Sequence, residues 1–162
     1  MNLVENTQKR LAAWKIDSLS LAGRVTLIKD VTSALPNYTM MYVKCSSETC
    51  LKLDKFNSDF LWGHTTNKND VYLIKWDNVC LSKRNGGLGI KKTKNMNQVL
   101  LTKIGRWLLH GENGIWCKLL QYKYLKNRNI ADSELTKGIT CSSTWKDIAF
   151  GAKLVAKVFN GE

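Results

Sequence analysis

The segment Trp76-Asp-Asn-Val-Cys-Leu-Ser-Lys-Arg-Asn-Gly-Gly-Leu-Gly-Ile90 places three glycines, two adjacent cations and an aromatic residue in the middle of the chain. Glycines this close together indicate positive φ angles or a close approach to another segment. From Lys75 to Arg106 the chain has eight Lys or Arg residues and one acid, Asp77. A tight basic turn that leads into a basic helix predicts a cradle for a phosphate backbone. The alternative is a turn between packed elements with solvated lysines around it.

The whole chain is basic as well. Its 162 residues carry a formal net charge of +12, which favours polyanionic partners, nucleic acid first. Hydrophobic residues make up 44% of the chain and six are tryptophan, so it can bury a core. With no repeat and one proline, we expect a single helical domain over residues 1–162, with a weak joint near residues 126–141.

Cysteine and histidine usage excludes several kinds of site. The five cysteines are an odd number without a repeated spacing, which rules out a complete disulfide framework. No Cys-x-x-Cys occurs, and His64 and His110 lie far from any matching cysteine pair, so we expect no metal. The first residues lack an apolar leader region, and no apolar run approaches the roughly 20 residues that span a bilayer. The sequence therefore predicts an intracellular protein of the nucleus or cytoplasm, not secreted and without a membrane partner.

Apolar residues at helical spacing predict a mainly α fold, with five to six amphipathic helices and one small β element near 71–76. Ser20 suits the N-cap of one helix, and either Ser46 or Ser47 suits the N-cap of the next. Gly63 suits a helix C-terminus. Residues 71–76 are short, β-branched and aromatic, which favours a strand. The expected helices cover residues 5–16, 20–35, 46–62, 95–110, 115–125 and 143–159, with Asn95 and Ser143 as further caps.

No catalytic signature accompanies the glycines. They are not followed by Gly-Lys-Ser/Thr, and the position where a dinucleotide fingerprint needs glycine is Lys92. No nucleophile elbow is present. No Asp-Asp pair occurs either, so the sequence has no motif for a two-metal site. We therefore expect no catalytic residue, no cofactor and no small-molecule substrate.

Ordered motifs along nearly the whole chain resemble one family. The chain resembles the region C-terminal to the catalytic palm in plant LINE-type (non-LTR) retrotransposon reverse transcriptases, a family often labelled ribonuclease H proteins. It departs from that family at Lys103-Ile-Gly-Arg-Trp107, where the family usually reads Lys-Trp-x-Trp-Arg. The matching motifs are Leu19-Ser-Leu-Ala-Gly-Arg24, Pro36-x-Tyr38, Phe60-Leu-Trp-Gly63, Trp76-Asp77, Gly86-Gly-Leu-Gly-Ile90, Asn97 with Leu100-Leu101, Trp116, Lys123-Tyr124 and Ser142-x-x-Trp145-Lys146.

The resemblance implies a thumb or connection segment that carries neither active site. The family's Tyr/Phe-x-Asp-Asp polymerase motif has no match here, and its ribonuclease H acids would lie beyond Glu162. A helical thumb grips an RNA–DNA or DNA duplex through its backbone, independently of sequence. The expected phosphate contacts are Arg24, Lys83, Arg84, Lys91, Lys92 and Lys103, presented by the turn at Gly86, Gly87 and Gly89.

Two other hypotheses stay open. In the first, the chain is a decayed or domesticated retroelement fragment that acts as a protein-interaction module or has no function. In the second, it is an enzyme whose site is not visible in the sequence.

Four tryptophans suit stacking on bases, although a buried core position is the expected role for each. These are Trp14, Trp62, Trp76 and Trp116.

Overall fold

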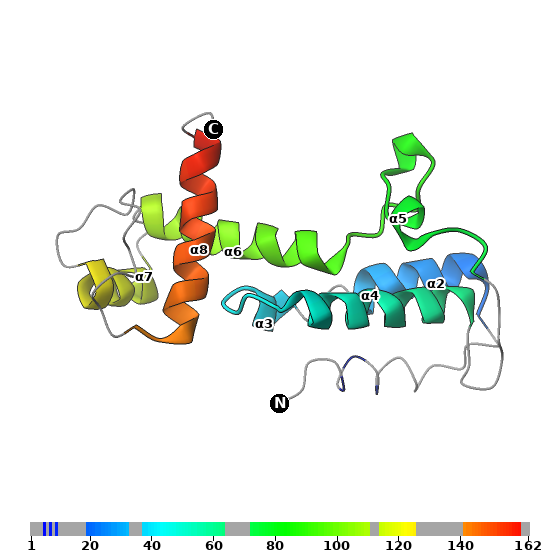
Figure 1. Ribbon diagram of the computed structural model, residues 1–162, viewed down its shortest axis with the longest axis horizontal. Coiled ribbons are helices and arrows are strands. Elements are labelled where there is room, and N and C mark those ends of the chain that lie inside the picture. Colours follow the sequence, from blue (N-terminus) through cyan, green and yellow to red (C-terminus); the bar gives the residue numbers. More distant parts are fainter. Residues whose placement is uncertain are drawn as a thin grey trace. The chain divides into compact units, whose positions relative to one another are not determined.

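The computed structural model is mainly helical (Figure 1). Helices account for 77% of the described residues, which confirms the predicted mainly α fold. The expected helix over residues 5–16 and the weak joint near 126–141 fall largely outside these residues. The structure describes residues 5, 7, 9, 19–32, 37–63, 72–110, 114–125 and 141–159.

Seven α-helices lie in the described part of the chain, slightly more than the five to six expected. Two of them continue without a break into a π-helical turn, so that each pair forms one longer helical segment. The elements are α2 (Leu21–Leu27), η2 (Ile28–Thr32), α3 (Asn37–Met40), α4 (Ser47–Trp62), α5 (Trp76–Val79), η3 (Lys83–Asn85), α6 (Thr93–His110), α7 (Ile115–Leu120), η4 (Gln121–Leu125) and α8 (Ser143–Phe159).

The predicted small β element near 71–76 is wrong. Residues 72–75 form no strand, and α5 begins at Trp76. The Lys75 carbonyl accepts hydrogen bonds from the backbone N–H groups of Asn78 and Val79 at 2.9 and 3.2 Å. A single strand leaves its backbone groups unpaired, whereas the helical turn at α5 pairs them locally. Asp77 in the first turn also suits the positive end of the helix dipole.

The expected N-caps of α2 and α4 and the expected C-terminus of α4 are confirmed. Ser20 Oγ accepts a hydrogen bond from Gly23 N at 3.3 Å, and Ser46 Oγ accepts one from Thr49 N at 3.1 Å. Gly63 follows α4 with a φ angle of 74°, which a glycine adopts without steric cost. These ends could be predicted because each depends on residues within four positions along the chain.

Helix α6 begins earlier than expected, and α8 has a different capping residue from the one expected. Helix α6 begins at Thr93, two residues before Asn95. The carboxylate of Asp54 in α4 accepts hydrogen bonds from Thr93 N at 3.0 Å and Thr93 Oγ1 at 2.6 Å. A carboxylate from another helix therefore pairs with the first backbone N–H group of α6, which has no partner within the helix. At α8 the capping oxygen belongs to Ser142, which accepts from Trp145 N at 3.3 Å.

The chain divides into two compact units. Unit 1 comprises residues 1–38 and 45–96, and unit 2 comprises residues 39–44 and 97–162. The expectation of a single domain stays a prediction. In unit 1, α2 and α4 lie side by side (Figure 1) and bury a shared apolar core with α5 and the segment that follows it. The buried residues of this core are Ile28, Phe60, Leu61, Val79 and Ile90.

The core of unit 2 joins α6, η4 and α8. The rings of Tyr124 and Trp145 stack there, with centroids 4.5 Å apart and an interplanar angle of 14°. Helices α6 and α8 approach each other closely at two glycines, Gly105 and Gly151, whose positions place backbone against backbone. The buried residues of this core are Ile104, Leu108, Tyr124, Leu125, Trp145, Ile148 and Ala149.

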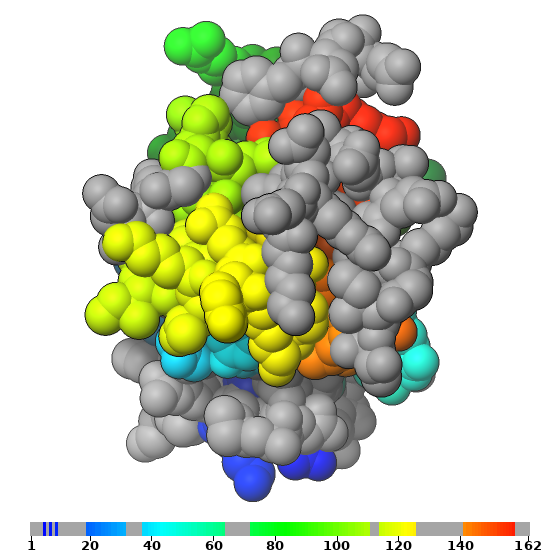
Figure 2. Space-filling view, turned by 90° about the vertical axis from the view of Figure 1, so that its left-hand side faces the viewer, coloured from blue at the N-terminus to red at the C-terminus, as the bar shows by residue number. Residues whose placement is uncertain are grey.

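Helix α7 differs from its expected orientation. Trp116 was expected to be buried, yet its side chain is 38% exposed, and Leu119, three residues later, is 63% exposed. Cys117 is buried instead, together with Leu125 at the end of η4. Figure 2 faces α7 and η4, shown in yellow, and they form part of this surface. Only part of the apolar stripe of α7 therefore serves the core.

Asn97 is a buried polar residue that links α6 to the loop after α3. Its side chain is 3% exposed, and Nδ2 donates to the carbonyl oxygens of Met40 at 2.9 Å and Val43 at 2.8 Å. Replacing Asn97 by alanine leaves both carbonyls without this donor, so we expect the free energy of unfolding to fall by about 2 kcal/mol. Urea denaturation measures this change. Gln98→Ala, at the exposed neighbouring position, is the control and should change stability by under about 0.5 kcal/mol. Equal stability of the two variants would contradict the prediction.

Candidate nucleic-acid interface

The glycine segment forms a compact turn, which we call the basic loop (residues 82–92). Gly86 and Gly89 have φ angles of 79° and 67°, in the region that favours glycine. Gly87 has a different reason to be glycine. A Cβ at that position would lie 2.2 Å from the carbonyl oxygen of Leu81, so no larger residue fits without moving the backbone.

The backbone N–H groups of this turn are used inside it. Gly87 N donates to Ser82 O at 3.0 Å, Leu88 N to Val79 O at 2.9 Å, and Gly89 N to Leu81 O at 2.8 Å. Turns that bind phosphate through the main chain instead leave several N–H groups pointing outward. At residues 85–89, therefore, side chains and not main-chain N–H groups are available to contact an anion.

Lys29 connects the basic loop to η2. Its Nζ donates to the carbonyl oxygen of Leu88 at 2.5 Å, and the side chain is half-buried. This contact was not among the predicted ones. Helical spacing could have indicated that Lys29 lies beside the inward face of the helix, since it follows Val25 by four residues, but it does not identify Leu88 as the partner. This bond holds the loop against the core of unit 1.

Three of the expected phosphate contacts are exposed on the basic loop. Lys83 and Arg84 lie on η3, and Lys91 follows the turn. The side chain of Lys83 runs along the turn, since its Cγ lies 3.7 Å from where a Cβ on Gly89 would be. Among the described residues, none of the three cations forms an ion pair. Their charges therefore face solvent, and no acid in the described part of the chain pairs with them.

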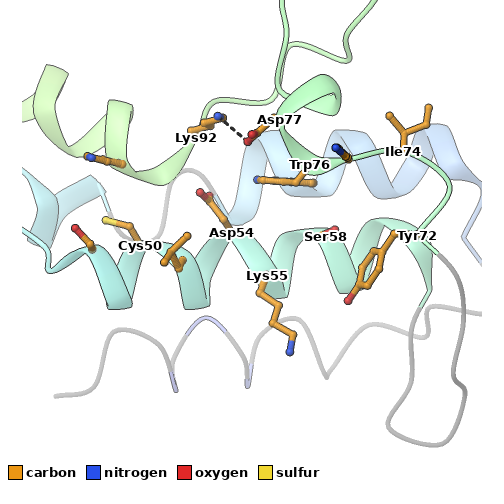
Figure 3. A pocket seen from close by; sticks show the side chains of 13 residues that line it. Cys50, Asp54, Lys55, Ser58, Tyr72, Ile74, Trp76, Asp77 and Lys92 are labelled. Atoms are coloured by element: carbon orange, nitrogen blue, oxygen red, sulfur yellow. Dashed lines mark ion pairs between the residues drawn. The ribbon is translucent and has the colours of Figure 1, made fainter.

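Lys92 differs from these three because it has an acidic partner. Its Nζ lies 2.7 Å from Oδ1 of Asp77, the ion pair drawn as a dashed line in Figure 3. The hydrogen bond to Asp77 is the main cause that raises the pKa of Lys92. Asp77 is 76% exposed, so solvent weakens this attraction. A phosphate at Lys92 would have to compete with the carboxylate.

Arg24 lies in α2, and the structure places its guanidinium at the end of α4. Nη1 donates to the carbonyl oxygen of Leu61 at 3.3 Å. The same nitrogen would lie 2.6 Å from a Cβ on Gly63. Arg24 is half-buried in this position and serves the last carbonyls of the helix, as cations near helix ends do. Its role as a phosphate contact stays a prediction.

Lys103 belongs to unit 2 and is not part of the basic loop. It is exposed on α6, with Nζ 4.8 Å from the ring centroid of Trp107 on the same helix. A cation above an indole face gains a modest electrostatic attraction. Of the six expected cations, the basic loop thus brings together Lys83, Arg84, Lys91 and Lys92.

The described tryptophans are mostly half-buried. Trp62 and Trp76 pack against the core of unit 1, as expected for core residues. Trp116 is more exposed and lies at an angle to Trp107, with ring centroids 6.1 Å apart. Trp14 lies outside the described residues.

The described part of the chain offers neither a reactive thiol at Cys50 or Cys80 nor a metal cluster. Burial is the main cause that raises the pKa of the Cys80 thiol to about 11, and it also raises the pKa of Cys50. Both thiols are therefore protonated near neutral pH and are poor nucleophiles. No cluster of three or more metal-ligating side chains occurs among the described residues.

None of the described helices has the length and apolar character that crossing a membrane requires.

Comparisons with known proteins find relatives in Arabidopsis thaliana. The chain is 39% identical over 153 residues to "Putative ribonuclease H protein At1g65750", in an alignment that covers 93% of this chain. The chain spans 24% of that protein's length.

A second relative is similar in length to this chain. The chain is 30% identical over 125 residues to "Uncharacterized mitochondrial protein AtMg00310" of Arabidopsis thaliana, in an alignment that covers 76% of this chain and 80% of the relative. No protein-family model and no solved structure matches the sequence. The chain therefore belongs to the same plant protein family as this mitochondrial protein.

Proposed function

We propose that this chain is a non-catalytic, nucleic-acid-binding segment of a plant retrotransposon reverse transcriptase. In this role it grips the backbone of a primer–template duplex and does not read the sequence. The basic loop carries the proposal, because Lys83, Arg84 and Lys91 present three exposed charges on a turn that its own hydrogen bonds hold in shape.

The geometry of the loop suits a duplex backbone. Phosphate contacts from Lys and Arg position a protein on nucleic acid without carrying sequence information. Lys29 restrains the turn from inside, so less conformational freedom is lost when the loop meets a phosphate. The net charge of +12 adds a long-range attraction to any polyanion.

The relatives support the retroelement part of the proposal. One of them carries ribonuclease H in its name, and the ordered motifs of this chain resemble the region that follows the palm in LINE-type reverse transcriptases. Because the chain spans 24% of that relative, the activity in its name is not assigned to this segment. We expect neither polymerase nor nuclease activity from the chain alone.

A salt series tests the proposal. Fluorescence anisotropy would follow binding of the purified chain to two RNA–DNA hybrids of equal length and unrelated sequence. We expect log affinity to fall linearly with log salt concentration, with a slope of about −0.9 for each phosphate contacted. The two hybrids should give the same affinity and slope, because the contacts are made to the backbone.

Two results would contradict the proposal. A folded chain that binds neither hybrid at low salt would favour a retroelement relic or a protein-interaction module. A preference for one sequence that persists at high salt would indicate base reading, not a grip on the backbone. Circular dichroism confirms that the chain is folded under the conditions of each titration.

A further inference from the structure

A pocket of about 770 Å³ opens in unit 1 between α4 and the segment 72–77 (Figure 3). Its size lies in the range of pockets that enclose small organic molecules. Leu51 and Asp54 of α4 line one side, Tyr72 and Trp76 the other. Lys92 lines it too, so the pocket adjoins the basic loop.

Aromatic and apolar side chains line most of the pocket. Figure 3 shows the indole of Trp76 beside Asp54, on the side of α4 that faces the segment 72–77. Leu51 and Ile74 are 68% and 49% exposed although they are large apolar side chains. The Tyr72 hydroxyl donates to Asp59 at 2.5 Å, which fixes the position of that ring. A flat aromatic group would cover this surface and could stack on either ring.

The charges around the pocket favour an anion. Both acids that line it already have partners, since Asp54 accepts from Thr93 and Asp77 pairs with Lys92. The remaining cations are exposed and form no ion pair within the described part of the chain. They are Lys55, Lys75 and Lys94.

We propose that this pocket holds the base of an unpaired nucleotide, with the surrounding lysines at its phosphates. Base stacking on aromatic side chains next to a cationic groove is a general way of binding single strands. Since the basic loop grips the duplex in the proposed function, the adjoining pocket receives a nucleotide from a single-stranded overhang. The inference rests on that proposed function and names the part of the substrate that this pocket takes.

The test uses two RNA–DNA hybrids with overhangs of equal length and equal charge. One overhang has adenine bases, and the other has abasic residues in the same positions. Because both carry the same phosphates, the ratio of their affinities reports the bases alone. We expect the parent chain to bind the adenine overhang about ten-fold more tightly.

A pair of matched variants assigns this preference to the pocket. Leu51→Glu places a negative charge on the pocket wall, and Leu73→Glu makes the same change at a position outside the lining. Both leucines are exposed, at 68% and 78%, so neither change should unfold the chain. We expect Leu51→Glu to reduce the ratio to near one and Leu73→Glu to leave it unchanged.

The failure of this inference can be told apart from failure of the proposed function. If the parent chain binds the adenine and abasic overhangs equally well and binds a blunt hybrid normally, the pocket proposal is wrong. The proposed contact with the duplex backbone then still stands. Equal ratios in the parent and Leu51→Glu, or equal losses in both variants, also overturn the pocket. A folded parent that binds no hybrid overturns the two proposals together.

Discussion

Replacing Lys83, Arg84 and Lys91 together by glutamate is expected to weaken binding to an RNA–DNA hybrid by roughly two orders of magnitude at low salt. The same triple variant should flatten the slope of log affinity against log salt by about three, one for each phosphate that the variant no longer binds. All three side chains are exposed, and no ion pair among the described residues depends on them. We therefore expect the fold to stay intact while binding falls. Anisotropy titrations across a salt series measure both quantities.

A second triple variant separates the loop from the effect of net charge. Lys118, Lys146 and Lys157 are exposed lysines of unit 2, and replacing them by glutamate changes the net charge by the same amount. If phosphates contact the basic loop, this control should bind more tightly than the loop variant and keep a slope close to that of the parent. Equal reductions in affinity for the two variants would contradict the assignment, since general attraction to a polyanion would then explain the binding.

Features of the fold that depend on neighbouring residues could be predicted from the sequence. Ser20 and Ser46 cap their helices within three residues, and Gly63 ends α4 with a positive φ. The dense glycines likewise indicated a turn at residues 86–89. In each case the residue type and the structure it favours lie within a single turn of chain.

Contacts between distant residues could not be predicted in this way. Asp54 accepts the hydrogen bond from the first N–H group of α6 although it lies 39 residues before Thr93. Lys29 donates a hydrogen bond to Leu88, which lies 59 residues later in the chain. Arg24 donates one to Leu61 near the end of α4, which lies 37 residues later. Such pairs depend on how the helices pack, which the local pattern of residues does not record. For the same reason the aromatic run near 71–76 resembled a strand, although no partner strand exists for it in the described structure.

The departure from the resembled family at Lys103–Trp107 has a structural counterpart. Gly105 stands in the middle of that segment, and a Cβ there would lie 2.4 Å from Ala152 N in α8. Gly151 faces α6 in the same way. The backbones of α6 and α8 therefore approach closely where this chain has two glycines. This close crossing explains why glycine is needed within helices, where it otherwise costs about 1 kcal/mol relative to alanine.

The close crossing predicts a large effect for a small substitution. Replacing Gly151 by alanine is expected to lower the free energy of unfolding by about 3 kcal/mol. The added Cβ would lie 2.2 Å from the carbonyl oxygen of Leu101 and 2.6 Å from its carbonyl carbon. Both are backbone atoms, so the clash is relieved only if the two helices move apart and loosen the core that contains Ile104 and Ile148. Urea denaturation followed by circular dichroism measures the change.

Gly23→Ala is the matched control, since it is the same substitution within a helix. A Cβ on Gly23 would meet Ser20 Oγ at 3.5 Å and Leu19 Cδ2 at 3.7 Å, which are ordinary contacts. We expect this variant to be as stable as the parent or more stable by about 0.5 to 1 kcal/mol, because alanine favours the helix and restricts the unfolded chain. If Gly151→Ala gained stability in the same way, helix propensity would outweigh packing, and α6 and α8 could not be in backbone contact. A large destabilisation in Gly151→Ala alone would place the requirement for glycine at the crossing itself.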